Sequence, residues 1–385
     1  MAITAMTAFE SQNILTDPGF SIGVGGTAMA YSSTQARTGT WSIRCNPASG
    51  VNQSGGHPLG NFNHFGLYCA SLPTVERRFA GVIAANSVNL RMTSAGAIAV
   101  YVNTTLLGTS SAAFASPGWH WIGYRGGNAS GSVVYLKIDG VDEVTSSTTS
   151  SVNSGTYGCA GTEASAIDLY FDDFLQDDTG FLEPSKVALL LPISDNARAT
   201  LWTGGTGGTT NLWDAVNNTP PVGTATETDT TQIEHAGGAA GTTDAYDANM
   251  TTYTTAGVNT GDTVLAVQGT VSWGEDSATG TKLLGFSGVS NPSWTGLASA
   301  DVSFGHGSAA LGTWAAGADG WNENRSAVSN SPSVTLGTSP VMRVVRPETA
   351  TRVASVCYMA MHVAWTPAAV VAEDPMPYIS GGYYP

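Results

Sequence analysis

The stretch IDLYFDDFLQDDTG, from Ile167 to Gly180, begins as a β-strand and ends as a turn. Ile167, Leu169 and Phe171 alternate with polar residues or tyrosine, which is the period of two expected of a strand with one buried face. The alternation breaks at Asp173, which falls on the apolar face. The sequence therefore predicts either a β-bulge at this position or a buried carboxylate that needs a partner.

The turn that closes this stretch predicts a domain boundary. Asp177, Asp178 and Gly180 favour a turn, and Phe181–Pro184 follows them as a short connection. The length of 385 residues suits two domains. We predict a first β domain with an N-terminal arm at residues 1–180, a second β domain at 184–372, and a Pro- and Tyr-rich tail at 373–385.

Short strands separated by turn residues continue along the chain. The clearest pair is the hairpin SVVYLKIDGVDEV (Ser132–Val144), in which Val134, Leu136 and Ile138 share one face and Asp139–Gly140 supplies the turn. Apolar residues at helical spacing never extend beyond about two turns. The sequence therefore predicts an all-β fold with two jelly-roll-like β-sandwiches in tandem.

In the second half, the pattern predicts a central strand and one short helix. Val264–Trp273 is partly apolar on both faces, as expected in the middle of a sheet, and Lys282–Ser287 is its expected partner. Leu212–Val216 is predicted to form one helical turn. An aromatic tail packs better on a neighbour than in water, so we expect a set of tail tyrosines to dock against another subunit. They are Tyr378, Tyr383 and Tyr384.

The composition is acidic overall and poor in charge. Charged residues make up 11% of the chain and the formal net charge is −15, so no basic surface is expected for nucleic acid. A surface rich in Ser, Thr, Asn and Gly fits either an extracellular β protein or a protein covered by neighbours in an assembly. Both interpretations stay open.

The N-terminus and the cysteines bear on where the protein is made. The start MAITAMTAFESQN lacks the features of a signal peptide, and no apolar run is long enough for membrane insertion, so we expect synthesis in a cytoplasm. Cys45, Cys69, Cys159 and Cys357 are too far apart to predict a zinc site. A Cys45–Cys69 or Cys45–Cys159 disulfide stays open, although cytoplasmic synthesis disfavours it.

The order of motifs in the first half resembles a known family. GTWSIR from Gly39, GWHWIGYR from Gly118, the VYLKIDGVDEV hairpin and the closing IDLYFDDF strand are similar to the concanavalin A-like (laminin G-like) jelly roll over about residues 8–180. The resemblance implies a jelly-roll fold. It does not choose a function, because this fold hosts lectins, glycosidases and structural modules.

The second half resembles the domain that follows such a jelly roll in bacteriophage virion proteins. The motifs are KVALLLPISDNARATLWTG (Lys186–Gly204), NLWDAVNNTPPVG (Asn211–Gly223), GDTVLAVQGTVSW (Gly261–Trp273) and VASVCYMAMHVAWTP (Val353–Pro367). The family includes minor tail, decoration and fibre proteins. The resemblance implies a structural place in the virion, with other virion subunits or further copies of this chain as partners.

An acidic cluster near the end of the first half is the candidate metal site. Several oxygens close together suit Ca²⁺, although the spacing matches no EF-hand, and a solvated strand face with an Asx turn is the alternative. The cluster consists of Asp168, Asp172, Asp173, Asp177 and Asp178. No other cofactor is expected. The ExDxE-type run of concanavalin-like glucanases and the common nucleophile motifs are missing, so we expect no enzyme activity.

Aromatic residues offer two kinds of binding surface. Trp119, Trp121 and Tyr124 could form a platform that stacks on sugars, but Trp119 and Trp121 share a strand face, and the alternative is that this face belongs to the core. A second set in Gly- and Asn-rich loops is a candidate for contact with a partner or a host glycan. It consists of Trp294, Trp314 and Trp321. The sequence predicts a phage structural protein acting through protein–protein contacts, with host-glycan binding as the alternative.

Overall fold

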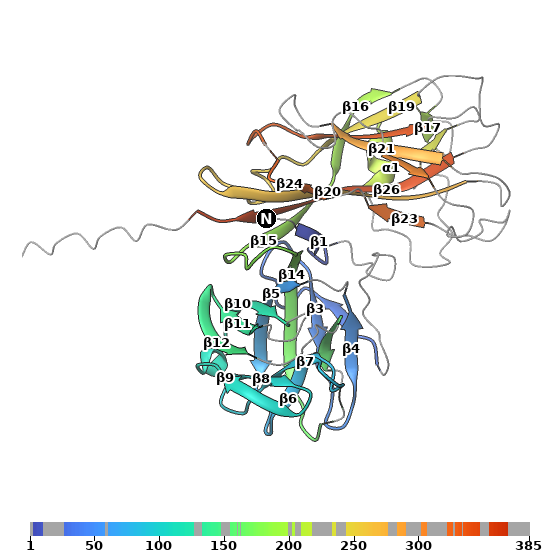
Figure 1. Cartoon of the computed structure of the whole chain (residues 1–385). Coiled ribbons are helices and arrows are strands. Elements are labelled where there is room, and N and C mark those ends of the chain that lie inside the picture. Colours follow the sequence, from blue (N-terminus) through green and yellow to red (C-terminus); the bar gives the residue numbers. More distant parts are fainter. Residues whose placement is uncertain are drawn as a thin grey trace, which may run out of the picture.

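The structure is a computed structural model of the chain. It describes residues 3–10, 27–57, 61–126, 133–147, 155–159, 161, 163–198, 202–204, 209–217, 233–235, 244–275, 283–289, 302–305, 322–325, 328–332, 334–346 and 354–368. Nearly all elements in these ranges are β-strands, which confirms the predicted all-β class. Figure 1 shows two bodies of strands, with β1 and β15 between them.

The first body is a sandwich of two antiparallel sheets. One sheet has the order β12 (Val141–Ser147), β11 (Val133–Ile138), β10 (Trp119–Arg125), β5 (Phe62–Ser71), β14 (Asp168–Asp177), β3 (Ser42–Cys45), β2 (Ala30–Ser32), and β1 (Ile3–Thr7) also pairs with β14. The other has the order β4 (Gln53–Gly56), β13 (Thr156–Cys159), β6 (Arg77–Gly81), β7 (Val88–Met92), β8 (Ile98–Val102), β9 (Thr105–Thr109). A 3₁₀ helix, η2 (Ala113–Ala115), precedes β10.

The second body is also built of two sheets. One has the order β17 (Trp202–Gly204), β18 (Ile233–His235), β26 (Ala354–Thr366), β20 (Thr263–Glu275), β23 (Asn322–Arg325), with β15 (Lys186–Leu190) on β26 and β24 (Ser329–Asn330) on β20. The other has the order β16 (Pro192–Arg198), β19 (Asp244–Met250), β25 (Val341–Arg346), β21 (Leu283–Val289), β22 (Val302–Gly305). The predicted helical turn is present as α1 (Leu212–Val216). Among the described residues, no helix is long and apolar enough to span a membrane.

The core of the first sandwich follows the strand alternation. Phe65 and Leu67 of β5 and Leu169 and Phe171 of β14 are fully buried, because alternate residues of a strand point to the same face. The predicted β11–β12 hairpin is confirmed: Val134, Leu136 and Ile138 are buried, and Asp139 and Gly140 take positive φ angles of 52° and 83°. These angles are those that the tight turn requires.

The break in alternation at Asp173 produces both predicted consequences. The pairing of β14 with β5 shifts register between Asp172 and Leu175, and Asp173 has a φ of 51°. The bulge turns Phe174 into the core, while Asp173 itself is fully buried and has charged and polar partners. The predicted bulge is therefore confirmed, and the buried carboxylate with it.

The predicted partner of the central strand in the second half is wrong. β20 pairs along its whole length with β26 and also with β23 and β24, so its central position is confirmed. The segment that contains Lys282–Ser287 instead forms β21, which pairs with β22 and β25 in the other sheet. β20 and β26 have 13 residues each. They form a longer antiparallel ladder than β20 could form with β21, which has seven residues.

An apolar cluster joins the two sandwiches. β1 contributes Ile3 and Met6, and the first sandwich adds Trp121, while Val187 of β15 and Ala364 of β26 close the cluster from the second sandwich. Each of these side chains is at most 2% exposed. The N-terminal strand is therefore part of the junction between the two sandwiches, as its position in Figure 1 shows. Burial of this apolar area holds the two bodies together.

The four cysteines are buried and carry free thiols. Cys45 on β3 and Cys159 on β13 lie on facing sheets of the first sandwich, and their thiols interact. Burial raises the pKa of the Cys45 thiol well above its usual value. Cys69 belongs to the same core, whereas Cys357 lies in a small cluster on β26.

Candidate functional site

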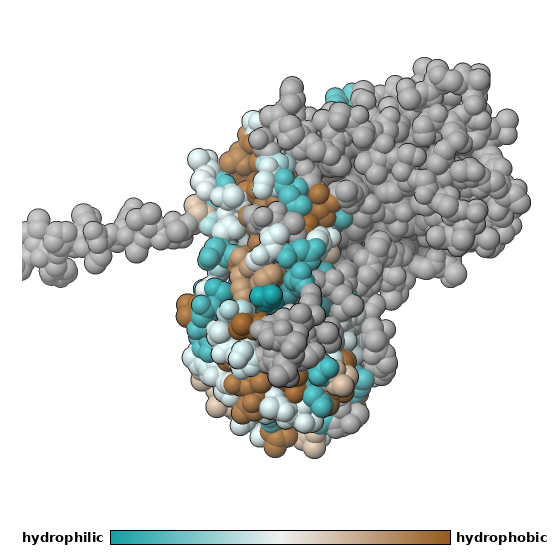
Figure 2. Space-filling model, in the orientation of Figure 1, coloured by the Kyte–Doolittle hydropathy of each residue, from teal (hydrophilic) through white to brown (hydrophobic). Residues whose placement is uncertain are grey.

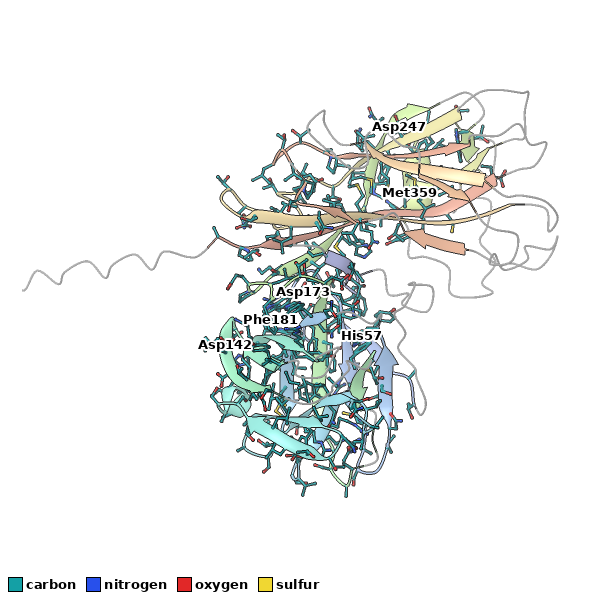
Figure 3. All side chains as sticks on the ribbon, viewed as in Figure 1. His57, Asp142, Asp173, Phe181, Asp247 and Met359 are labelled. Carbon is teal, nitrogen blue, oxygen red and sulfur yellow. The ribbon has the colours of Figure 1, made fainter. Side chains whose placement is uncertain are left out.

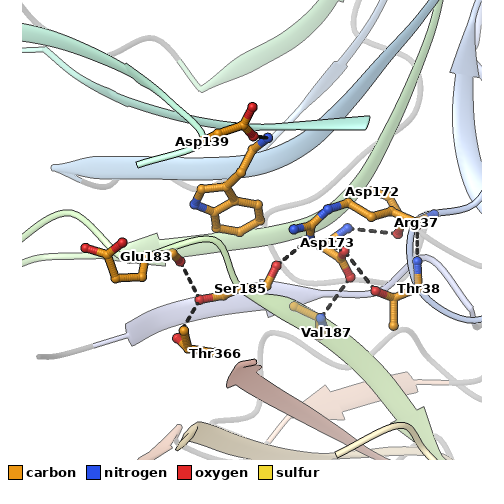
Figure 4. Close-up of polar contacts among 10 residues, drawn as sticks. Arg37, Thr38, Asp139, Asp172, Asp173, Glu183, Ser185, Val187 and Thr366 are labelled. Carbon is orange, nitrogen blue, oxygen red and sulfur yellow. Dashed lines mark hydrogen bonds and ion pairs between the residues drawn. The ribbon is translucent and has the colours of Figure 1, made fainter. Parts of the chain in front are cut away.

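The paired carboxylates of β14 form a buried clamp with the segment before β3. Arg37 Nη1 donates to Asp173 Oδ2 at 2.6 Å, and Thr38 Oγ1 donates to the same oxygen at 3.0 Å. Asp172 Oδ2 accepts from the backbone N–H groups of Arg37 and Thr38 at 2.7 and 3.2 Å. Val187 N donates to Asp173 Oδ1 at 2.8 Å, which ties the clamp to β15 (Figure 4). Figure 3 shows Asp173 at the junction of the two bodies.

Arg37 reaches this position by crossing the outer face of the first sandwich. A Cβ on Gly66 would lie 2.6 Å from Arg37 Cδ, so only glycine at this position leaves room for the side chain. The guanidinium then lies 5.0 Å from the centre of the Trp121 ring and donates to the Ser185 carbonyl. Ser185 Oγ is 3.0 Å from Thr366 Oγ1 of β26, so the clamp extends into the second sandwich.

The charged groups of the clamp are buried and paired within the protein, as expected of groups that stabilise the structure. Burial raises the pKa of Asp172 and Asp173, and for Asp173 the nearby Arg37 opposes this rise. Burial also raises the pKa of Glu10 to about 7. Glu10 Oε1 accepts hydrogen bonds from the backbone N–H groups of Thr40 and Trp41, which oppose this rise. Asp172 and Asp173 are both fully buried and hydrogen-bonded within the protein, so they do not face each other across an open cleft.

The other predicted metal-site carboxylates have separate roles. Asp168 forms an ion pair with Arg44, and Asp177 Oδ1 accepts from the backbone N–H groups of Thr179 and Gly180 in the turn after β14. Asp178 is exposed. The described parts of the chain contain no group of three or more His, Cys, Asp or Glu residues placed to hold a metal ion. The structure therefore does not bring the five carboxylates into one site.

The predicted sugar platform is divided between two faces of β10. Trp119 is half-buried on the outer face of the sheet. Trp121 shares that face but is buried beneath Arg37 and stacked on His64, and its Nε1 donates to the Leu182 carbonyl at 3.4 Å. Tyr124 points the other way and belongs to the core. Only Trp119 of the three lies where a ligand could contact it.

Trp119 belongs to a row of side chains that crosses the outer face. The strand register places Trp119 of β10 opposite Tyr68 of β5, Tyr68 opposite Tyr170 of β14, and Tyr170 opposite Arg44 of β3. Ring centres are 5.7 Å apart for Trp119 and Tyr68 and 6.0 Å apart for Tyr68 and Tyr170. The Arg44 guanidinium lies 5.5 Å from the centre of the Tyr170 ring. We call these four residues, with Asp168, the aromatic strip.

The aromatic strip is partly exposed except at Tyr170. Trp119, Tyr68 and Arg44 are partly exposed, whereas Tyr170 is 2% exposed between its neighbours. Arg44 Nε and Nη2 donate to the two oxygens of Asp168 at 2.9 and 2.8 Å, which fixes the guanidinium over Tyr170. Four neighbouring strands at a spacing of about 4.8 Å give the row a length of about 14 Å.

The sequence contained a signal for the missed members of the strip. Phe65, Leu67 and Cys69 share the core face, so Tyr68 must point outward, and the same alternation in β14 turns Tyr170 outward. Their alignment into one row with Trp119 depends on the pairing register between three strands, which no local pattern reveals. The remaining predicted contact residues lie outside the described residues. They are Trp294, Trp314, Trp321, Tyr378, Tyr383 and Tyr384.

A hollow lies beside the connection between the sandwiches. It has a volume of about 280 Å³, and its walls include Asp177, Phe181 and Leu182 from the connection and Leu265 and Thr366 from the second sandwich. The Asp177 carboxylate is already hydrogen-bonded to backbone N–H groups of the turn after β14. Figure 2 shows that apolar and polar residues are interspersed over the described surface of the first sandwich.

Comparisons with known proteins give only remote likenesses. No protein-family model matches the chain, and no curated protein matches it significantly. One similar solved structure is a carbohydrate esterase from Shiga toxin-encoding bacteriophage phi24B, with 16% identity and a TM-score of 0.30 over 44% of this chain and 98% of that one.

Two further similar structures are binding domains. The tandem CBM22 domain of Paenibacillus barcinonensis Xyn10C has 11% identity and a TM-score of 0.24 over 94% of this chain and 97% of that one. The binding domain of botulinum neurotoxin DC, in complex with SialylT, has 8% identity and a TM-score of 0.30 over 87% of this chain and 92% of that one. TM-scores this low carry no argument about function, which must come from the chain's own geometry.

Proposed function

We propose that this protein is a non-catalytic β-sandwich protein that binds carbohydrate through the aromatic strip of its first sandwich. The observation that carries the proposal is the row Trp119–Tyr68–Tyr170–Arg44, which crosses four strands in register. The partly exposed rings of Trp119 and Tyr68 offer apolar faces for the C–H side of a sugar ring. The Arg44–Asp168 pair at one end offers donors and acceptors for sugar hydroxyl groups.

The position of the strip supports binding in preference to catalysis. A rigid sheet carries each side chain, and packing between neighbours holds the rings in place, so little freedom is lost when a ligand docks. Glycoside hydrolysis requires two carboxyl groups about 5–10 Å apart across a site with room for the sugar. Asp172 and Asp173 are instead buried in the clamp with Arg37 and Thr38.

A glycan array with matched variants tests the proposal. Removing an exposed stacking ring in Trp119→Ala or Tyr68→Ala should weaken binding about tenfold. Tyr101→Ala is the control, because Tyr101 lies in the other sheet and is also partly exposed, and the centre of its ring is 4.0 Å from the guanidinium carbon of Arg91. Circular dichroism should show all variants folded. A wild-type protein that binds no glycan, or an equal loss in Tyr101→Ala, would overturn the proposal.

A structural place on a phage particle is a second candidate function. It is supported by the low content of charged residues, 11% of the chain, which suits a surface covered by neighbours. Leu106 on β9 and Val141 on β12 are 51% and 60% exposed, and both strands are sheet edges within the described residues. Labelling purified phage particles with an antibody to this chain, followed by electron microscopy, tests this role; unlabelled particles would exclude it.

A further inference from the structure

We infer that the aromatic strip selects neutral sugars over acidic ones. This inference rests on the proposed carbohydrate binding and specifies its ligand class. The strip has one cationic member, Arg44, and one anionic member, Asp168. Whether the site attracts a sugar carboxylate depends on what Arg44 can offer it.

Arg44 is already neutralised by its partner. Its Nε and Nη2 donate to Asp168 Oδ1 and Oδ2 at 2.9 and 2.8 Å, which is the two-pronged geometry that a sugar carboxylate would need. An acidic sugar would have to displace Asp168 or approach it at close range. Displacement would leave the Asp168 carboxylate without its partner, and close approach would place two negative charges side by side.

The other cationic side chains of the same outer face also have ion-pair or aromatic partners. Arg37 is bound to Asp173 and lies over Trp121. Lys137 forms an ion pair with Asp142 at 3.0 Å and lies 5.3 Å from the centre of the Phe181 ring. Arg125 lies 5.1 Å from the centre of the Phe62 ring, and it is separated from Trp119 by the length of β10. None of these groups reaches the strip as an uncompensated positive charge.

The net charge of the whole chain also disfavours acidic sugars. The formal net charge is −15, which repels acidic glycans at low ionic strength. A neutral sugar avoids this cost, and its hydroxyl groups can donate to the remaining lone pairs of Asp168. The same Asp168 side chain therefore favours hydroxyl groups and disfavours carboxylates.

The variant Asp168→Asn separates the two effects. It removes the neutralising charge and preserves the size of the side chain, so Arg44 becomes available to a carboxylate. The matched control is Glu76→Gln, because Glu76 contacts Arg91 at 3.2 Å and Tyr101 at 3.1 Å in a similar cluster on the other sheet. Thermal unfolding should confirm that both variants are folded.

The experiment uses an array of neutral oligosaccharides and their sialylated or uronic acid-containing counterparts. The wild-type protein should retain neutral members at least about tenfold better than acidic ones in low salt, and Asp168→Asn should shift this ratio toward the acidic members by about three- to tenfold. Glu76→Gln should leave the ratio unchanged. Preferential binding of acidic members by the wild type, or an unchanged ratio in Asp168→Asn, would overturn the inference alone. A wild-type protein that binds nothing would overturn the proposed carbohydrate binding itself.

Discussion

Ile3 and Asn330 are joined as if they belonged to paired strands, although 327 positions separate them. The side-chain amide of Asn330 accepts from Ile3 N at 2.8 Å and donates to Ile3 O at 3.2 Å, as a neighbouring backbone would. β1 also pairs with β14 of the first sandwich, and Ile3 is 2% exposed. The N-terminal strand is therefore bound to both sandwiches.

Replacing Asn330 should loosen this connection. Asn330→Ala removes both hydrogen bonds and leaves polar backbone groups of Ile3 without their partner, which should lower the free energy of unfolding by about 1–3 kcal/mol. Asn330→Asp keeps the acceptor but loses the donor and should have a smaller effect. Urea denaturation measures both. An Asn330→Ala protein as stable as the wild type would show that Asn330 does not hold β1 in place.

The Arg37–Asp173 pair should be strongly coupled. Arg37→Met leaves a buried carboxylate without its cation, and Asp173→Ala leaves the guanidinium without its anion, so each should cost about 3–5 kcal/mol of unfolding free energy. The double variant should cost less than the sum of the two, because the second change removes the unpaired charge. Lys137→Met, at a more exposed ion pair, is the control and should cost about 0–1 kcal/mol. Additive losses in the double variant would show that the two groups act independently.

The carboxyl groups near the junction should make stability depend on pH. Burial raises the pKa of Glu10 from 4.5 to about 7, so between these values the folded protein binds more protons than the unfolded chain. Stability from this group is therefore present below pH 4.5 and is lost as the pH rises through 7. Asp172 and Asp173 contribute in the same direction, since burial also raises their pKa.

The variant Glu10→Gln isolates this contribution. Its side-chain oxygen can still accept from the N–H groups of Thr40 and Trp41, but it does not titrate. The fall in unfolding free energy between pH 5 and pH 8, measured by denaturant titration, should be smaller in Glu10→Gln than in the wild type. An identical pH profile would show that Glu10 titrates normally in the folded protein.

The thiols should be protected in the native protein. All four cysteines are buried, and burial raises the pKa of Cys69 to about 12, which suppresses the reactive thiolate. A thiol reagent such as DTNB should therefore label the folded protein very slowly and the denatured protein at all four positions. Rapid labelling of the folded protein at pH 8 would contradict the burial of these residues.

Much of the local structure could be read from the residues. The alternation of apolar side chains predicted β11 and β14, and the break at Asp173 predicted a bulge or a buried acid, both of which are present. These features depend on neighbours in the chain, because side-chain direction repeats every two residues. The pairing of β20 with β26 was missed, since the competition between β21 and β26 as partners depends on strands that lie far apart in sequence.

The candidate site likewise depends partly on local sequence and partly on contacts between distant segments. Alternation along the two strands turns Tyr68 and Tyr170 away from the core, and the composition leaves few charges for the surface; both follow from the order of residues alone. The alignment of these tyrosines with Trp119 and Arg44, and the covering of Trp121 by Arg37, instead depend on how the strands and loops pack together. Side-chain direction along a strand is set by local backbone geometry, whereas strand register and the burial of surface side chains are set by contacts between distant segments that must all be satisfied together.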